Sequence, residues 1–394
     1  MKNRICFVVQ RYGEEVNGGA EQHCRQYAER MTKYYSVDVI TTKAKDYVSW
    51  KNEYTKDEEI INGVTVHRFG VDFERDVKKF NQFSKKILQL YSSKEEEIEW
   101  MKQQGPYSSK LLEYISSNKE HYDVFIFFTY LYCTTYFGLP LVKEKAILIP
   151  TAHDELPIYL SIFRELFQMP KGVFYNTKIE QKFVEEKFEN NYIFNNNGKG
   201  GVGVEVPEGV LKERFIRNHG IDDFILYVGR IDEHKGCKEL FQYFKEYKKR
   251  NPGKIKLVLV GKQVIDIPHD LNIINLGFVS EQEKFDALAA CRFLVLPSQF
   301  ESLSMVVLEA MAMEKPVLVH GNCEVVKEHC LQSNGGLYYC NYFEFEGAIN
   351  YLGKHENEVL QMGKNGKKYV ALNYRWDMIL ERLKEMIDYV SGEH

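Results

Sequence analysis

The chain has 394 residues, of which 44% are apolar and 27% charged, a balance typical of a soluble globular protein with room for two domains. A net charge of −4 and a pI near 6.3 argue against a general nucleic-acid-binding protein. Eight cysteines are scattered without a Cys-x-x-Cys pair, which favours a reducing, cytoplasmic compartment and argues against a structural zinc site.

Two stretches bear on secretion and membrane insertion. Residues 1–10 have too short an apolar core for a signal peptide and are more typical of a buried strand. Residues 124–142 carry no charge, but their apolar part ends at Phe128, and polar residues, Gly138 and Pro140 follow. Because a spanning helix needs about twenty predominantly apolar residues, this stretch favours a buried strand, a loop and a short helix. No transmembrane segment is predicted.

Short apolar runs alternate with helical patterns through the first half of the chain. A helix over about residues 20–33 follows the first run and turns Tyr27, Ala28 and Met31 inward. Buried strands separated by helices predict an α/β fold with a parallel, doubly wound sheet. The predicted strands of this half are 5–10, 37–42, 64–69, 123–128, 146–150 and 174–176.

Residues 75–118 interrupt this alternation. Lysines interleave with apolar residues and predict a basic amphipathic helix, after which a run of glutamates over 95–99 reverses the charge. Two interpretations remain open: a solvated helical insertion, or an interfacial helix that gives peripheral association with an anionic membrane surface. The helix residues concerned are Lys78, Lys79, Phe80, Phe83, Lys85, Lys86, Ile87 and Leu88.

A polar, glycine-dense stretch over 195–209 predicts an interdomain linker, and a second alternating series follows it. The predicted domains are therefore 1–200 and 201–375, with a C-terminal helix within 376–394 whose apolar residues recur at helical spacing. The second series comprises strands 224–228, 255–260, 273–276, 292–296 and 316–320 and helices 237–250, 281–290 and 304–313.

The segment 297–311 places charged and backbone groups at the start of a helix. A strand ends at its beginning and a helix begins near Ser302, with Glu301 at the mouth and Glu309 two turns in, on the same side. The free N–H groups of residues 302–305 would face an anion such as a diphosphate, and carboxylates suit sugar hydroxyls. The simpler alternative is an ordinary α/β unit, capped by Ser302, with glutamate favoured by the helix dipole.

Two cations follow an earlier strand of the same half. Arg230 and Lys235 come after the strand that ends in Gly229, and cations at the carboxyl end of a parallel strand are well placed to neutralise phosphates. The alternative is a pair of surface cations without a role. Gly261 and Gly277 end two further strands of the series.

The first half contains two weaker candidates. Gly18 and Gly19 open the first helix, where glycine lets a backbone approach a ligand closely, although neither a dinucleotide-binding turn nor a P-loop is present. His153 and Asp154 follow a central strand at the edge of the sheet where ligands bind. A simple turn and a satisfied local pair are the alternatives.

The segment from Phe300 to Val317 resembles the signature of retaining glycosyltransferases of family four (glycosyl transferases group 1), which have the GT-B fold. That fold consists of two Rossmann-like doubly wound domains facing across a cleft. Val228-Gly229-Arg230, Lys235-Gly236, the Gly18 loop and the His153 segment resemble further motifs of this family. The family more often has glycine at 302 and 304, a departure that leaves the backbone role intact.

The resemblance implies roles for the candidate residues. The first domain would bind the acceptor and be braced by the C-terminal helix, and the second would bind the nucleotide sugar. Arg230 and Lys235 would grip the diphosphate, Glu301 would contact the donor-sugar hydroxyls, and His153 would approach the donor sugar. Donor binding would also involve Gly18, Gly19, Gly229, Gly261, Lys262, Phe278, Val279, Ser302, Leu303, Ser304, Met305, Val306 and, at the ribose, Glu309.

These features predict a retaining glycosyltransferase that uses a UDP- or GDP-sugar and a glycan or lipid-linked acceptor in surface polysaccharide or glycoconjugate biosynthesis. No Asp-x-Asp pair occurs in the chain, so cations and helix-start amides would stabilise the diphosphate without a metal cofactor. A GT-B-fold epimerase or phosphorylase, and a non-catalytic nucleotide-sugar-binding protein, are the alternatives. An epimerase would need further acid–base residues.

Overall fold

The protein is described by a computed structural model that covers residues 3–16, 18–89 and 91–392. It divides into two compact units: the first runs to Gly201 and takes in the chain from Ile379 onward, and the second is Val202–Met378. The predicted borders, after residues 200 and 375, lie one and three residues before the borders in the structure, which fall after Gly201 and Met378. The predicted outer limits, residues 1 and 394, lie outside the described residues.

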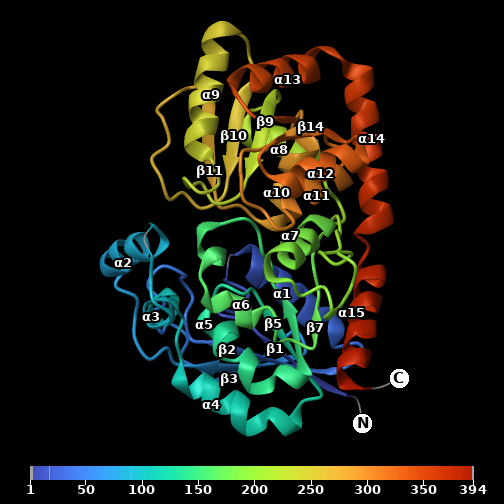
Figure 1. Ribbon diagram of the computed structural model, residues 1–394. Helices are drawn as coiled ribbons and strands as arrows, with labels where there is room; N and C mark the ends of the chain where they lie inside the picture. The colour runs from blue at the N-terminus through green and yellow to red at the C-terminus, as the bar shows by residue number, and fades with distance from the viewer. Residues whose placement is uncertain (1–2, 17, 90, 393–394) are drawn as a thin grey trace. The chain divides into compact units, whose positions relative to one another are not determined.

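Within its described residues, the first unit is built on an eight-stranded sheet of order β3-β4-β2-β1-β5-β6-β7-β8, in which only the β3–β4 pair is antiparallel (Figure 1). The central strand β5 (Val124–Phe128) is fully buried, which explains its unbroken apolar sequence. The other strands are β1 (Arg4–Val8), β2 (Ser36–Thr42), β3 (Glu58–Ile61), β4 (Val64–Phe69), β6 (Ala146–Ile149), β7 (Gly172–Val173) and β8 (Phe194–Asn195).

The helices of the first unit begin with α1 (Gly19–Met31), which buries Tyr27, Ala28 and Met31 as predicted. The uncharged stretch forms β5, a loop and two short helices, and no helix in the described part of the chain is long and apolar enough to cross a membrane. Apart from α2, α3 and α15, which are described below, the helices that follow are α4 (Ser109–Asn118), η1 (Lys119–His121), α5 (Cys133–Tyr136), η2 (Leu139–Lys145), η3 (Leu156–Tyr159), α6 (Ile162–Leu166) and α7 (Lys178–Phe188).

The interrupted region over 75–118 begins with the amphipathic helix α2 (Val77–Gln89), which is followed by α3 (Lys94–Gln104). Phe80 and Ile87 of α2 are buried in the hydrophobic core of the first unit, with Phe83 packed against it. The apolar face of α2 is therefore occupied by protein. This packing agrees with a solvated insertion. It leaves these apolar side chains unavailable for contact with the acyl chains of a membrane, which the interfacial-helix hypothesis requires.

The C-terminal helix α15 (Trp376–Ser391) packs on the first unit from Ile379 onward. Its Tyr389 stacks on Phe194 with ring centroids 3.9 Å apart, and the Val390 carbonyl accepts a hydrogen bond of 3.0 Å from Lys171. Full burial of an aliphatic side chain contributes roughly 1.5–3 kcal/mol. The side chains that α15 buries most completely are Ile379, Leu383, Met386, Ile387 and Val390.

The second unit contains a wholly parallel sheet of order β11-β10-β9-β12-β13-β14 among its described residues. The strands are β9 (Phe224–Val228), β10 (Lys256–Val260), β11 (Ile273–Gly277), β12 (Leu294–Leu296), β13 (Val317–His320) and β14 (Gly336–Tyr339). The helices are α8 (Lys212–His219), α9 (Cys237–Arg250), α10 (Glu281–Ala290), α11 (Met305–Ala312), α12 (Glu324–Ser333), α13 (Tyr342–Lys354) and α14 (Glu356–Asn373).

The predicted elements differ from the structure at several places, and helices α7, α8, α12, α13 and α14 were not predicted. Strands β3, β8 and β14 were not predicted because they are short and only partly buried. The strand predicted at 174–176 lies earlier, as β7. The helix start predicted near Ser302 lies too early: α11 begins at Met305, because Ser304 has a left-handed backbone with φ of 64°.

Candidate functional site

The strand order of the second unit reverses between β9 and β12, which are neighbours in the sheet. Ligands of doubly wound sheets bind beside the carboxyl ends of the strands at such a switch point. The loops that follow β9 and β12 touch there: a Cβ on Gly236 would lie 2.4 Å from the Pro297 carbonyl oxygen. The structure therefore brings the Arg230–Lys235 loop and the Glu301 loop together.

Glycines join the strand ends beside this point. Gly229 has φ of 152° and donates its N–H to Val260, and Gly261 has φ of 141° and donates to Gly277. A Cβ on Gly261 would lie 1.9 Å from the Gly229 carbonyl oxygen, so only glycine fits. The predicted residues Lys262 and Phe278 follow these glycines and are exposed, and Val279 is half-buried.

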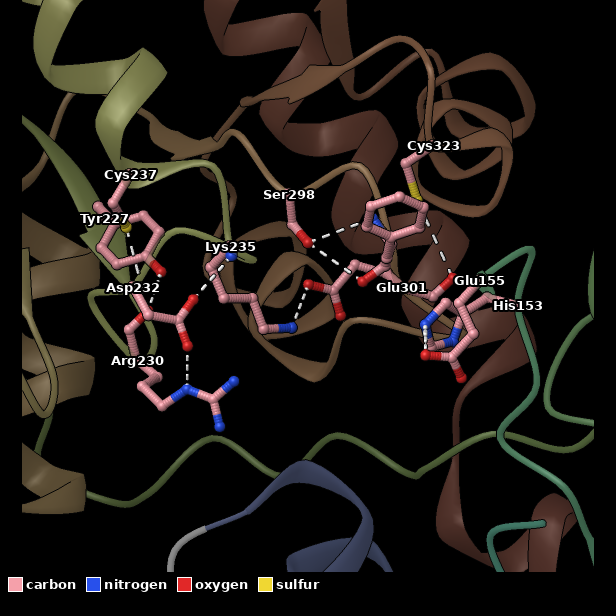
Figure 2. A network of polar contacts seen from close by, with 11 residues as sticks. His153, Glu155, Tyr227, Arg230, Asp232, Lys235, Cys237, Ser298, Glu301 and Cys323 are labelled. Carbon is pink, nitrogen blue, oxygen red and sulfur yellow. Dashed lines mark hydrogen bonds and ion pairs between the residues drawn. The ribbon is translucent and has the colours of Figure 1, made fainter. Parts of the chain in front are cut away.

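A chain of polar contacts links the two loops (Figure 2). The Arg230 side chain donates to the carboxylate of Asp232, and Asp232 also accepts the Lys235 backbone N–H at 2.8 Å. Lys235 Nζ lies 2.6 Å from Glu301 Oε1. The three predicted residues Arg230, Lys235 and Glu301 thus meet in one network. Asp232, which sequence reasoning missed, is buried and binds the Arg230 side chain and the Lys235 backbone; its place between the two cations in Arg-x-Asp-x-x-Lys was the available clue.

The loop before α11 corrects one argument from the sequence. Glu301 lies outside the helix and Glu309 inside it, so the two carboxylates do not share a helix face through their eight-residue spacing. Leu303 and Ser304 are buried, and Ser302, Met305 and Val306 are half-buried around the helix start. The side chain of Ser304 makes no capping hydrogen bond, which leaves backbone N–H groups at the start of α11 for a ligand.

Glu309 has its own cation, Lys284, in α10. Lys284 Nζ lies 2.8 Å from Glu309 and 2.7 Å from Glu281. Burial raises the pKa of the Glu309 carboxyl, and the Lys284 charge opposes this rise. Burial acts to lower the pKa of Lys284, but Glu309 and Glu281 outweigh it, and the net shift is upward. Lys284 therefore remains charged and fixes the orientation of Glu309.

The glycine loop of the first unit leads into α1. Gly18 precedes the helix with an extended backbone and Gly19 is its first residue; neither position has a positive φ. A Cβ on Gly18 would lie 2.1 Å from Glu21 Oε2, the tip of a flexible side chain. Glu21 forms a buried ion pair of 2.5 Å with Arg11, and that contact ties the helix start to the loop.

His153 follows β6 at the same carboxyl edge of the first sheet. Its Nε2 lies 3.5 Å from Glu155 (Figure 2). Glu155 also accepts a 2.6 Å hydrogen bond from Tyr130. The buried carboxyl of Glu180 accepts the backbone N–H groups of Ala152 and Asn176, both at 2.6 Å, and so joins the loops after β6 and β7. Burial raises the pKa of Glu180 to about 8, although the N–H donors oppose this. Sequence reasoning missed Glu180.

Cysteine and metal chemistry were also considered at the sequence level. All eight cysteines lie in the described part of the chain as free thiols, and all except Cys340 are buried. No cluster of three or more histidine, cysteine, aspartate or glutamate side chains with metal-binding geometry occurs within residues 3–16, 18–89 and 91–392.

The sequence of this chain is similar to a family model and to known proteins. Residues 212–369 match the family model described as glycosyl transferases group 1. The lipopolysaccharide 1,2-N-acetylglucosaminetransferase of Salmonella typhimurium is 27% identical over 41% of this chain and 47% of its own length. The N,N'-diacetylbacillosaminyl-diphospho-undecaprenol alpha-1,3-N-acetylgalactosaminyltransferase of Campylobacter jejuni is 30% identical over 46% and 50%. The chain spans about half the length of the curated relatives it matches.

Solved structures are similar along the whole chain. Sucrose-phosphate synthase from Thermosynechococcus elongatus has a TM-score of 0.71 at 14% identity and covers 100% of both chains. HepE from Anabaena, solved with UDP-glucose, has a TM-score of 0.68 at 14% identity, covering 98% of this chain and 99% of its own. The fold is therefore the α/β GT-B fold with two parallel-sheet units, and the family match and relatives support the glycosyl transferases group 1 family.

Proposed function

We propose that this protein is a retaining glycosyltransferase that moves a sugar from a nucleotide-diphospho-sugar to an acceptor hydroxyl in glycoconjugate biosynthesis. The observation that carries the proposal is the network of Arg230, Asp232, Lys235 and Glu301 at the switch point of the second unit. It combines cations for a diphosphate with a carboxylate for sugar hydroxyls. The family match over residues 212–369 covers all four residues.

In the proposed reaction the bond between the donor sugar and the diphosphate breaks, and the departing phosphate oxygen keeps the electron pair. Arg230, Lys235 and the N–H groups before α11 stabilise the charge that develops there, without a metal. The acceptor hydroxyl adds to the sugar carbon on the same face and gives its proton to the departing phosphate. Glu301 and Glu309 are assigned to the donor-sugar hydroxyls and the ribose in this proposal, so neither carboxylate serves as a nucleophile, and each pairs with a lysine, Lys235 or Lys284.

We place the acceptor on the first unit. A groove of about 460 Å³ lies between the loop after β1 and strand β3, and its lining includes Glu15, Lys45, Tyr54 and Arg68. Cations and carboxylates pair along this groove, with Lys45 3.2 Å from Glu15, so its lining offers donors and acceptors without a large net charge. A polyhydroxyl acceptor suits such a lining. The names of the Salmonella and Campylobacter relatives support a glycan or lipid-linked glycan as the acceptor class.

The test is donor turnover by the 394-residue chain. UDP- and GDP-sugars are first screened by thermal shift, because a ligand that binds only the folded state raises the apparent stability. The stabilising donor is then assayed for slow hydrolysis and for transfer to glycan acceptors, with the anomeric configuration of the product read by NMR. Retention supports the proposal. Inversion, release of an epimerised sugar, or binding without turnover contradicts it.

A matched pair of lysines sharpens this test. Lys235→Ala removes the proposed phosphate contact, whereas Lys238→Ala removes a nearby exposed lysine that pairs with Glu233 at 2.9 Å. We expect turnover to fall only in Lys235→Ala. A cytoplasmic location belongs to the proposal and is supported by the free thiols of all eight cysteines.

A further inference from the structure

Helix α12 contacts the loop that carries Glu301. His329, in the middle of α12, is buried, and its Nε2 lies 2.9 Å from the Leu303 carbonyl oxygen. Cys323, at the start of the same helix, places its Sγ 3.9 Å from the Glu301 carbonyl oxygen. One helix therefore contacts the loop at two carbonyl groups, and the stronger contact comes from an imidazole.

The hydrogen bonds of His329 define its tautomer. A carbonyl oxygen only accepts, so Nε2 carries the proton that is shared with Leu303. Burial lowers the pKa of His329 to about 4, and the neutral ring then has a bare Nδ1. That atom lies 3.0 Å from the Tyr369 hydroxyl of α14, which must donate to it. Both ring nitrogens are thus satisfied in a single orientation of the ring.

The Leu303 carbonyl shares a peptide plane with the N–H of Ser304. In a trans peptide these two groups point in opposite directions, so a carbonyl that faces His329 turns the Ser304 N–H away from α12. The left-handed φ of 64° at Ser304 costs a non-glycine residue free energy and persists only where its surroundings impose it. The His329 contact is one such constraint, and it acts on the peptide immediately before that residue.

We propose that His329 is a positioning residue, which fixes the Leu303–Ser304 peptide so that the Ser304 N–H and the following helix start face the donor diphosphate. This role rests on the proposed glycosyltransferase function. His329 acts through the peptide, without contacting the donor. A histidine that only fills the core would contribute to stability and leave the phosphate contact unchanged.

The experiment compares His329→Met, which removes the donor group at similar length, with His329→Gln, whose amide N–H can take the place of Nε2–H. Calorimetry measures the affinity for UDP or GDP, whichever binds the wild-type chain, and ligand-observed NMR measures the affinity for uridine or guanosine. We expect His329→Met to weaken diphosphate binding and donor kcat about tenfold or more, with unchanged nucleoside affinity. His329→Gln should recover most of both.

His23→Met is the matched control. His23 is buried in the first unit, its Nε2 lies 3.0 Å from the Gly201 carbonyl oxygen, and burial likewise lowers its pKa to about 4. Its loss should lower the melting temperature and leave diphosphate affinity unchanged. If His329→Met does not fold, Tyr369→Phe tests the same chain of bonds, and we expect a smaller loss in the same direction.

Two results would overturn the positioning role. One is a folded His329→Met or Tyr369→Phe variant with wild-type diphosphate affinity. The other is an equal loss of nucleoside and diphosphate affinity, which indicates a general disturbance of the unit. A wild-type chain that binds neither UDP nor GDP would instead contradict the proposed function itself, before any variant is made.

Discussion

Lys235 and Glu301 form an ion pair of 2.6 Å although they lie 66 residues apart in the chain. The pair joins the loops after β9 and β12, the two neighbouring strands at which the sheet order reverses. Lys235, which we propose binds the donor phosphate, and Glu301, which we propose binds the donor sugar, therefore neutralise each other before the donor binds. A bound donor would exchange this contact for a phosphate at Lys235 and a hydroxyl at Glu301, so the charges of these two side chains stay balanced in both arrangements.

The first prediction concerns Lys235→Ala. Removal of a preorganised charge at the departing phosphate should lower kcat about 100-fold or more. Stability should change little, because the Lys235 side chain is 31% exposed and such pairs contribute at most about 1 kcal/mol. Steady-state kinetics and thermal melting measure the two effects. Near-normal transfer by a folded variant would make Lys235 an ordinary surface lysine.

The second prediction concerns Glu309→Ala. Loss of a carboxylate that accepts ribose hydroxyls should weaken nucleoside diphosphate binding about tenfold or more, since each charge-assisted hydrogen bond contributes roughly 1.5–3 kcal/mol. The variant should also melt earlier, because Lys284, with a side chain only 12% exposed, keeps Glu281 as its only ionic partner among the contacts described here. Calorimetry and melting separate these effects.

Lys284→Met is the control for that experiment. It removes the supporting cation and leaves the Glu309 carboxylate in place, so a shift in stability with a smaller loss of affinity is expected. Equal nucleotide affinity in wild-type and folded Glu309→Ala protein would rule out the ribose assignment.

The third prediction follows from the lowered pKa of His329. Its pKa is about 4 in the folded chain against an ordinary value of 6.5, so the unfolded chain binds a proton first as the pH falls. The stability associated with the neutral ring is complete above about pH 6.5 and is lost between about pH 6.5 and 4, by up to about 3 kcal/mol. Urea unfolding across this range should give a steeper pH dependence for wild-type protein than for His329→Gln. Parallel slopes would contradict the buried neutral histidine.

The fourth prediction is that transfer survives chelation. If Arg230, Lys235 and the amides before α11 stabilise the departing diphosphate, EDTA should leave the rate nearly unchanged. The assay compares EDTA-treated enzyme with and without added Mg²⁺ or Mn²⁺. Loss of activity that either ion restores would show that charge stabilisation at the phosphate depends on a metal.

Five of the six strands and three of the seven helices that the structure describes in the second unit could be predicted, because there the local patterns agree with the fold. The ranges 224–228, 237–250 and 281–290 match β9, α9 and α10 to the residue, since buried apolar runs and amphipathic helices carry their own periodicity. The start of α11 could not be predicted. It depends on a left-handed Ser304 and on His329, 26 residues beyond Leu303, and these contacts exist only after folding.

The residues of the candidate site likewise divide into those that the sequence predicts and those that it does not. Motif spacing found Arg230, Lys235 and Glu301, because the carboxyl ends of parallel strands bring such residues together. Asp232, the partner of Arg230, and Lys284, the partner of Glu309, were missed. Asp232 is an ordinary loop acid until its contacts are known, and Lys284 lies on a helix without any motif. The tertiary structure decides which side chains pair across different helices and loops, and sequence periodicity does not reveal these pairs.

The last prediction concerns helix α2 and membranes. Its lysines project from a helix that buries Phe80 and Ile87 in the core and packs Phe83 and Leu88 against it, so insertion between acyl chains is not expected. An electrostatic contact remains available, although Lys79 pairs with Asp76 at 3.5 Å and Lys86 with Glu96 at 2.7 Å. A lysine near an anionic surface contributes about 1 kcal/mol, and these pairs reduce that contribution.

We therefore expect weak binding to vesicles that contain anionic lipid, lost as salt is raised and abolished when Lys78, Lys79, Lys85 and Lys86 are replaced by glutamate. Replacing Lys364, Lys367 and Lys368 of α14 by glutamate lowers the net charge by 6, against 8 for the α2 variant, and this control for charge elsewhere on the chain should have no comparable effect. Co-sedimentation at low and physiological salt measures both. Activity toward a soluble acceptor should survive, because the donor residues lie on other loops. If no binding is found, or the control reversal abolishes it equally, α2 is a solvated insertion and the membrane hypothesis is wrong.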